Sequence, residues 1–147
     1  MADFFKIKDF FKSLQTIISR NDNISEESVN YLGSPPHEIL NAKDKEFMVK
    51  FETMTEEEIA NTELDIAKIA ALLFTSRSRL FYKVKALTGM TPQKYIMEYR
   101  LERAEALLRE GKYSVTEISE MTGFVNASHF STKFKKKYGI APSRYNR

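Results

Sequence analysis

The apolar residues of this 147-residue chain follow a pattern that occurs twice in its second half. In each copy, three apolar residues at a spacing of three predict one face of a short helix: Ile66, Ile69 and Leu72, then Val115, Ile118 and Met121. Further along, seven positions match at an offset of 50 instead of 49: Leu80, Lys83, Val84, Lys85, Gly89, Pro92 and Tyr95 correspond to Phe130, Lys133, Phe134, Lys135, Gly139, Pro142 and Tyr145. The added residue falls around residues 123–126, in a turn, where insertions cost least. The pattern therefore indicates one supersecondary unit used twice.

Each unit is predicted to be a helix of roughly nine residues, a tight turn and a second helix of about twelve residues. Gly89 and Gly139 suit the ends of the second helices, because glycine adopts positive φ without strain. Thr75 or Ser76 can cap the start of the first of these helices, and Asn126 can cap the other. A short helix, a turn and a second helix form a helix-turn-helix, whose second helix can enter the major groove of DNA.

One long helix is predicted to join the two units. It begins with Thr91 as cap and Pro92 in the first turn, and it ends near Gly111. At 1.5 Å per residue, about 18 residues span roughly 27 Å, whereas successive major grooves on one face of DNA lie ~34 Å apart. The predicted fold class is all-α, with two helix-turn-helix subdomains, a long linker helix and an N-terminal helical extension.

The N-terminal part of the chain is organised differently. Residues 3–19 carry apolar side chains at heptad-like steps, which predicts an amphipathic helix. This helix packs on its own chain, forms a homodimer or is the tail of a missing upstream domain. Residues 20–41 contain turn and linker residues, and a helix is expected to resume near Ala42 and to end at Ile59 or Ala60. We therefore divide the chain into an N-terminal helix plus linker, 1–41, and a domain, 42–147. Within that domain we expect the first helix-turn-helix at about 64–90, the linker helix at about 92–110 and the second helix-turn-helix at about 115–139.

The charge is distributed unevenly around a net value of +3. Residues 64–147 contain 16 Lys and Arg against 7 Asp and Glu, whereas residues 1–63 contain 7 against 13. A basic half is a reason to expect a polyanionic partner, although a solvated basic surface would have the same composition.

The sequence lacks the residues that several classes of function require. The chain has no Cys and two His, His37 and His129, far apart in the sequence, so neither a disulfide framework nor a metal site is expected. No paired catalytic carboxylates, Ser/His/Asp set or phosphate-binding glycine loop is present, so we expect neither an enzyme nor a cofactor. Without an apolar run of ~20 residues or a signal peptide, we expect a cytoplasmic protein with no membrane contact.

Four stretches carry a resemblance to a known family: SRSRLFYKVKALTGMTP at 76–92, RLERAEALL at 100–108, ISEMTGF at 118–124 and HFSTKFKKKYGIAPSRY at 129–145. Together they resemble the DNA-binding domain of the AraC/XylS transcription regulators of bacteria. The wording of the first stretch is most similar to the C-terminal output domain of hybrid two-component regulators from Bacteroidetes. Residues 1–41 are too few for the receiver domain of such proteins, so we expect either a C-terminal piece or a regulator with a short extension.

The resemblance implies a sequence-specific transcription regulator that reads two adjacent major grooves of double-stranded DNA. Such proteins act through RNA polymerase, more often as activators than as repressors. The alternative is a non-enzymatic helical module that binds proteins, or DNA without sequence preference.

Candidate DNA contacts follow from the predicted second helix of each unit. In the first unit, Leu80, Val84 and Leu87 are expected in the core, and the resemblance places Ser78, Phe81 and Tyr82 toward base edges. Phe81 suits the core equally well, while Tyr82 can contact a thymine methyl and form a hydrogen bond. The full candidate set here is Ser76, Arg77, Ser78, Arg79, Phe81, Tyr82, Lys83 and Lys85.

In the second unit, Phe124, Phe130, Phe134 and Tyr138 are expected in the core. The candidate contacts are Asn126, Ala127, Ser128, His129, Ser131, Thr132, Lys133, Lys135 and Lys136. Some of the basic run 133–137 should meet phosphate groups, with a solvated cluster as the alternative. The acidic residues of the basic half are expected on the surface away from DNA: Glu102, Glu105, Glu110, Glu117 and Glu120. Arg100 and Arg103 are expected to pair with acidic neighbours on their own helix rather than with DNA.

Overall fold

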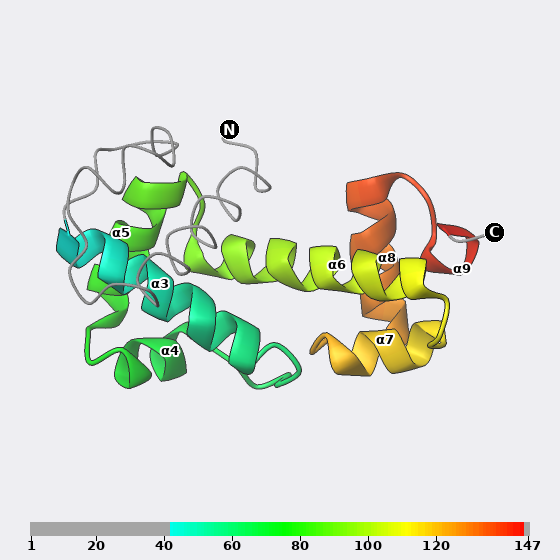
Figure 1. The fold of residues 1–147 in the computed structure, drawn as a ribbon, viewed down its shortest axis with the longest axis horizontal. Helices are drawn as coiled ribbons and strands as arrows, with labels where there is room; N and C mark the ends of the chain where they lie inside the picture. Colours follow the sequence, from blue (N-terminus) through cyan, green and yellow to red (C-terminus); the bar gives the residue numbers. More distant parts are fainter. Residues whose placement is uncertain (1–41, 146–147) are drawn as a thin grey trace. The chain divides into compact units, whose positions relative to one another are not determined.

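The computed structural model describes residues 42–145, which form seven helices and no strand (Figure 1). The helices are α3 (Ala42–Glu57), α4 (Ile66–Leu72), α5 (Arg77–Thr88), α6 (Pro92–Glu110), α7 (Val115–Met121), α8 (Ala127–Tyr138) and α9 (Pro142–Tyr145). The all-α prediction is confirmed, with one helix-turn-helix in α4–α5, a second in α7–α8 and the long α6 between them in the sequence. The helix expected over residues 3–19 lies outside the described residues.

The described residues form two compact units. The first contains residues 42–56 and 65–95, and the second contains residues 57–64 and 96–145. The long helix α6 therefore begins in the first unit and continues in the second. The segment between α3 and α4 belongs to the second unit, although both of those helices belong to the first.

The first unit is built on the apolar faces of α3, α4 and α5. The predicted helix after Ala42 is confirmed as α3, which ends at Glu57, a little earlier than expected. Its Phe51 ring packs 5.4 Å from the ring of Tyr95 at the start of α6. The core consists of Met48, Phe51, Ile66, Ile69, Ala70, Leu80, Val84, Leu87, Met90 and Tyr95.

The second unit buries a mainly aromatic core between α6, α7 and α8. Phe130 and Phe134 are fully buried, and Phe124 is buried with them, as the sequence predicted. The cluster comprises Leu101, Ala104, Leu107, Leu108, Ile118, Phe124, Phe130 and Phe134, and Tyr138 and Tyr145 pack against it half-buried. The last residue of each predicted short-helix triplet is less buried than expected, since Leu72 is 46% exposed and Met121 is 36% exposed.

The ends of both second helices follow the sequence prediction. Ser76 accepts a hydrogen bond from the Arg79 N–H at the start of α5, and Asn126 accepts one from the His129 N–H at the start of α8. Gly89 and Gly139 end these helices in the left-handed conformation. Each second helix is therefore 12 residues long and bounded by the same two devices.

Both turns contain the same helix-ending hydrogen bonds. The Thr75 N–H donates to Ala70 O and the Phe124 N–H donates to Ser119 O, in each case past a residue with positive φ. This is a Schellman motif, in which glycine is usual at the positive-φ position. The second turn has Gly123 there, but the first has Phe74, whose side chain is 98% exposed. The residue added in the second turn is Val125, which separates Phe124 from the cap Asn126.

Gly123 lies against the segment that connects α3 with α4. A Cβ atom added to it would stand 2.1 Å from Ile59 O, which is backbone and cannot turn aside. The guanidinium of Arg100 occupies the same place, donating from Nε to Ile59 O at 3.3 Å and from its terminal nitrogen to Asn61 O at 2.8 Å. Burial lowers the pKa of Arg100 from its ordinary value. Arg100 thus has a structural role, but its partners are carbonyls about 40 residues earlier instead of the expected helix neighbours.

Two acidic residues of α6 contradict the expectation that they lie on the surface. Glu102 and Glu105 are 8% and 7% exposed. Glu105 accepts a hydrogen bond from Tyr145 Oη at 2.5 Å and pairs with Arg109. Burial raises the pKa of Tyr138 above its ordinary value, and the charges of Glu105 and Glu102 raise it further. The hydrogen bond of Glu105 joins the C-terminal helix α9 to α6, a role that spacing along one helix could not reveal.

We expect a glycine at position 74 to be tolerated without loss of stability. A non-glycine residue in the left-handed region costs about 1–2 kcal/mol, which a glycine would recover. The greater conformational entropy of glycine in the unfolded chain cancels about 0.5–1 kcal/mol of this stabilisation. Phe74→Gly should leave the free energy of unfolding unchanged or raise it by up to about 1 kcal/mol in thermal or urea denaturation. Ala86→Gly, at an exposed position within α5, is the control and should lower stability. Equal losses in the two variants would contradict strain at Phe74.

We expect Gly123→Ala to destabilise the second unit much more than Gly139→Ala. Both glycines have φ near +77°, at +78° and +76°, so both variants carry the same backbone strain of about 1 kcal/mol. A Cβ at Gly139 would meet nothing within 4 Å, whereas one at Gly123 would collide with Ile59 O. The difference in unfolding free energy should reach about 2 kcal/mol. Similar losses would show that the contact with Ile59 is readily relaxed.

Candidate nucleic-acid interface

Helix α5 turns one row of side chains into the core and leaves the opposite row accessible. Leu80, Val84 and Leu87 are buried, as predicted. On the other side, Arg77, Ser78, Arg79 and Lys85 are exposed. Tyr82 is 72% exposed. Phe81, for which the sequence allowed either a core position or a position facing DNA, is half-buried.

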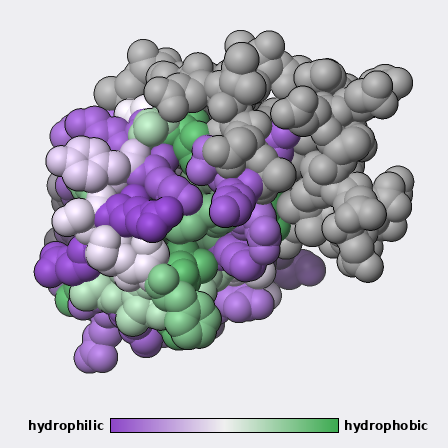
Figure 2. All heavy atoms as spheres, turned by 90° about the vertical axis from the view of Figure 1, so that its left-hand side faces the viewer, coloured by the Kyte–Doolittle hydropathy of each residue, from purple (hydrophilic) through white to green (hydrophobic). Residues whose placement is uncertain are grey.

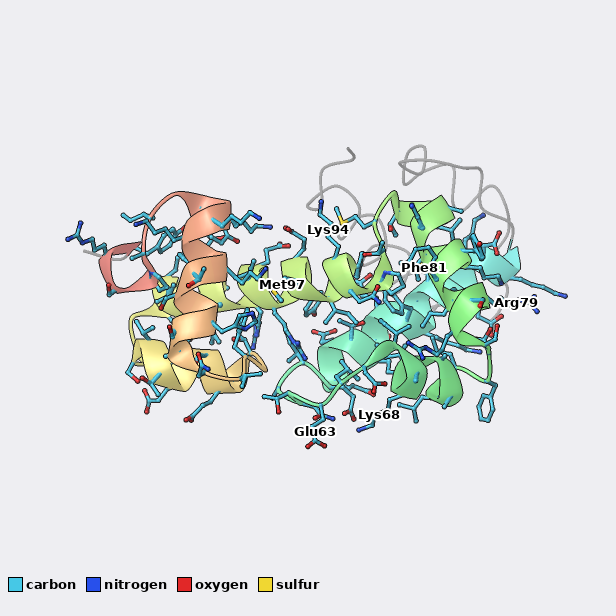
Figure 3. The ribbon with its side chains drawn as sticks, turned by 180° about the vertical axis from the view of Figure 1, so that it is seen from behind. Glu63, Lys68, Arg79, Phe81, Lys94 and Met97 are labelled. Atoms are coloured by element: carbon cyan, nitrogen blue, oxygen red, sulfur yellow. The ribbon has the colours of Figure 1, made fainter. Side chains whose placement is uncertain are left out.

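The start of α5 is strongly cationic. Arg77 and Arg79 stand in its first turn, which contains no acidic residue. The N-terminus of a helix already carries a partial positive charge, so cations there are unfavourable for the isolated helix. An anion that approaches this end would be attracted by both arginines and by the helix terminus. Figure 3 shows Arg79 on the outer side of α5.

A shallow hollow of about 270 Å³ opens beside this row. Its lining comes from three helices of the first unit: Ile66 of α4, Arg77, Ser78, Phe81 and Tyr82 of α5, and Gln93 of α6. Figure 3 shows Phe81 on the side of α5 that faces the start of α6. Ile66 and Gln93 were absent from the candidates predicted from the sequence, because packing alone brings these two residues to α5.

Lys83 is held by α3. Its Nζ lies 3.5 Å from Asp44 Oδ1 and 4.8 Å from the centre of the Phe47 ring. Its side chain is 27% exposed. A DNA contact by Lys83 stays a prediction, and any phosphate would compete with Asp44 for this cation.

Helix α8 presents smaller side chains than α5. Asn126, Ser128, His129 and Thr132 are exposed, and Ala127, Ser131 and Lys133 are half-buried. The side chain of Asn126 is used to cap α8, as that of Ser76 caps α5. The His129 ring packs 5.8 Å from Phe124. The described residues contain no group of three or more acidic or His side chains that could hold a metal.

The basic run at the end of α8 divides into two kinds of residue. Lys135 and Lys136 are exposed, whereas Lys137 is half-buried and pairs with Glu98 of α6. Cations in the last turn also favour the helix itself, through its dipole.

Figure 2 shows the face of the molecule at the left of Figure 1, where hydrophilic residues surround an apolar area. Within residues 42–145, the helices lack the combination of length and apolar composition that a membrane span requires.

The chain is similar to known helix-turn-helix proteins. A family model described as "Helix-turn-helix domain" matches residues 57–147. The chain is 32% identical over 142 residues to "Histidine kinase P4" of Formosa agariphila, a match that covers 96% of this chain and 10% of that protein. It is 39% identical over 74 residues to the "HTH-type transcriptional activator RhaS" of Salmonella arizonae, covering 50% of this chain and 27% of RhaS.

Among solved structures, the chain resembles the C-terminal domain of the two-component response regulator yesN from Fusobacterium nucleatum. The TM-score is 0.63 at 30% sequence identity, and the match covers 66% of this chain and 94% of that one. The chain thus spans a tenth to about a quarter of these two curated relatives and nearly all of an isolated C-terminal domain.

We expect removal of the Asp44 carboxylate to strengthen binding of duplex DNA if Lys83 contacts phosphate. Asp44→Asn should raise affinity about twofold to fourfold at low salt and steepen the dependence of log K on log salt by up to about one unit. Glu46→Gln removes the same charge from α3 but breaks an exposed pair with Lys50 instead. Equal effects of the two variants in a salt titration would mean that Asp44 does not restrain Lys83.

Proposed function

The chain belongs to the helix-turn-helix family of AraC-type DNA-binding domains, and from this membership we propose that it binds double-stranded DNA through two recognition helices, α5 and α8. We assign DNA binding to residues 42–147, with helix-turn-helix units at about 64–90 and 115–139 and the linker helix at about 92–110. The observation that carries the proposal is the repeated unit, in which each 12-residue second helix buries one row and leaves the other accessible.

The two helices would enter adjacent major grooves on one face of the duplex. A major groove about 12 Å wide admits one α-helix. Two copies of a single reading unit fit a bipartite site with halves about one helical turn apart. The cationic first turn of α5 and the exposed lysines of α8 supply the charge that attracts the phosphate backbone.

We further propose that the chain is the output part of a signal-responsive regulator, without enzymatic activity of its own. The match with a histidine kinase over 96% of this chain and the likeness to a response-regulator C-terminal domain support a two-component system. The similarity to RhaS, whose name describes a transcriptional activator, supports activation of transcription. We propose that this activation acts through RNA polymerase. Such a regulator acts in the bacterial cytoplasm. Dimerisation through residues 3–19 is the corresponding proposal for the N-terminal segment.

Selection of bound sequences from a random duplex pool tests the proposed function. We expect a bipartite motif with halves about 10 base pairs apart. Tyr82→Ala should relax one half-site, lowering affinity for its preferred base about tenfold, while Thr132→Ala should relax the other. Uniform weakening across both halves would contradict the assignment of these residues to base reading.

A salt titration with the selected duplex and a scrambled duplex separates the alternative functions. A sequence-specific regulator binds the selected duplex much more tightly at every salt concentration. Equal affinities would indicate a non-specific DNA-binding module, and no binding to either duplex would indicate a protein-interaction module.

A further inference from the structure

The three residues of α5 that are expected to face base edges have an unusual composition for this role. Bidentate recognition of guanine normally uses Arg or Lys, and recognition of adenine uses Asn or Gln. Ser78, Phe81 and Tyr82 contain none of these groups, and two of the three are aromatic. These three side chains are therefore suited to apolar contact with a base instead of bidentate hydrogen bonding to it.

The two aromatic rings form a fixed corner. Phe81 and Tyr82 pack edge to face, with ring centres 5.8 Å apart and planes at 90°. Lys85, one turn further along α5, places its Nζ 5.6 Å from the centre of the Phe81 ring. Because neighbours already hold Phe81, a ligand that contacts it loses little further side-chain freedom.

The hollow beside this corner is lined by both apolar and polar side chains. Ile66 is 8% exposed and contributes an aliphatic surface next to the Phe81 and Tyr82 rings. Ser78, Arg77 and Gln93 complete the lining with hydroxyl, guanidinium and amide groups. The lining of the hollow thus offers apolar contact together with hydroxyl, amide and cationic groups.

We propose that this hollow receives the 5-methyl group of a thymine in the first half-site, with Phe81 and Tyr82 as the residues that determine specificity. This inference rests on the proposed function, since α5 must lie in the major groove. Thymine is the one base with a methyl group on its major-groove edge. The Tyr82 hydroxyl can donate a hydrogen bond to the neighbouring O4 atom, although the same hydroxyl could accept one from cytosine, so the selection of thymine rests on its methyl group.

The test replaces thymine by deoxyuridine, which lacks the methyl group and keeps every hydrogen-bonding atom. The half-site read by α5 is first identified as the one that Tyr82→Ala relaxes. Deoxyuridine at the critical position of that half-site should weaken binding about fourfold, the value expected for one buried methyl group. In a half-site where cytosine replaces that thymine, 5-methylcytosine should bind about fourfold more tightly than cytosine for the same reason.

Variants show whether the effect belongs to the hollow. The loss caused by deoxyuridine should disappear in Tyr82→Ala and in Phe81→Ala, and it should persist in Tyr82→Phe, which keeps the ring, and in Thr132→Ala of α8. Tyr82 is largely exposed, so its variants should fold, and thermal melting checks each protein. Specific binding that is indifferent to deoxyuridine, or a first half-site without thymine preference, would overturn the inference and leave the proposed function intact. The absence of specific binding to any duplex would overturn both.

Discussion

The surface offered by each recognition helix depends on the burial of its opposite side. In α5 the buried row is Leu80, Val84 and Leu87, and in α8 it is formed by Phe130 and Phe134. At 3.6 residues per turn, burial of one row fixes the rotation of the helix about its axis and hence which residues remain accessible. Capping at Ser76 and Asn126 fixes where each helix begins. The accessible residues are thus selected by residues that would never touch DNA themselves.

The turns show how one backbone geometry is met by two different residues. Both helix-turn-helix units use a positive-φ residue, but Gly123 lies against Ile59 O while Phe74 faces solvent. A side chain at position 74 therefore costs backbone strain alone, whereas at position 123 it would displace a main-chain segment. Arg100 completes the same contact by donating to two carbonyls of that segment. Close backbone approach, more than the turn type, makes glycine necessary in the second unit.

The sequence predicted the features of the fold that arise from local chemistry. The repeat, the caps Ser76 and Asn126, and the left-handed Gly89 and Gly139 all follow from spacing and from residue types with one dominant conformational use. Contacts between distant segments could not be predicted in this way. Arg100 and Glu105 looked like exposed helix charges, yet one binds carbonyls about 40 residues earlier and the other a tyrosine 40 residues later. Likewise, Ile66 and Gln93 join the candidate interface by packing, which no periodicity in α5 reveals.

The two recognition helices share a scaffold but differ in what they offer to a nucleic acid. Helix α5 combines arginines at its start with two aromatic rings and a hollow, whereas α8 combines small polar side chains with exposed Lys135 and Lys136 near its end. Apolar contact with a base edge depends little on salt, whereas lysine–phosphate contact depends on it strongly. A duplicated unit can therefore divide the work, one copy contributing more to discrimination between bases and the other more to affinity. Because the buried rows hold each unit together, the exposed side chains of a recognition helix can change without disturbing the fold of its unit, whereas the buried ones cannot.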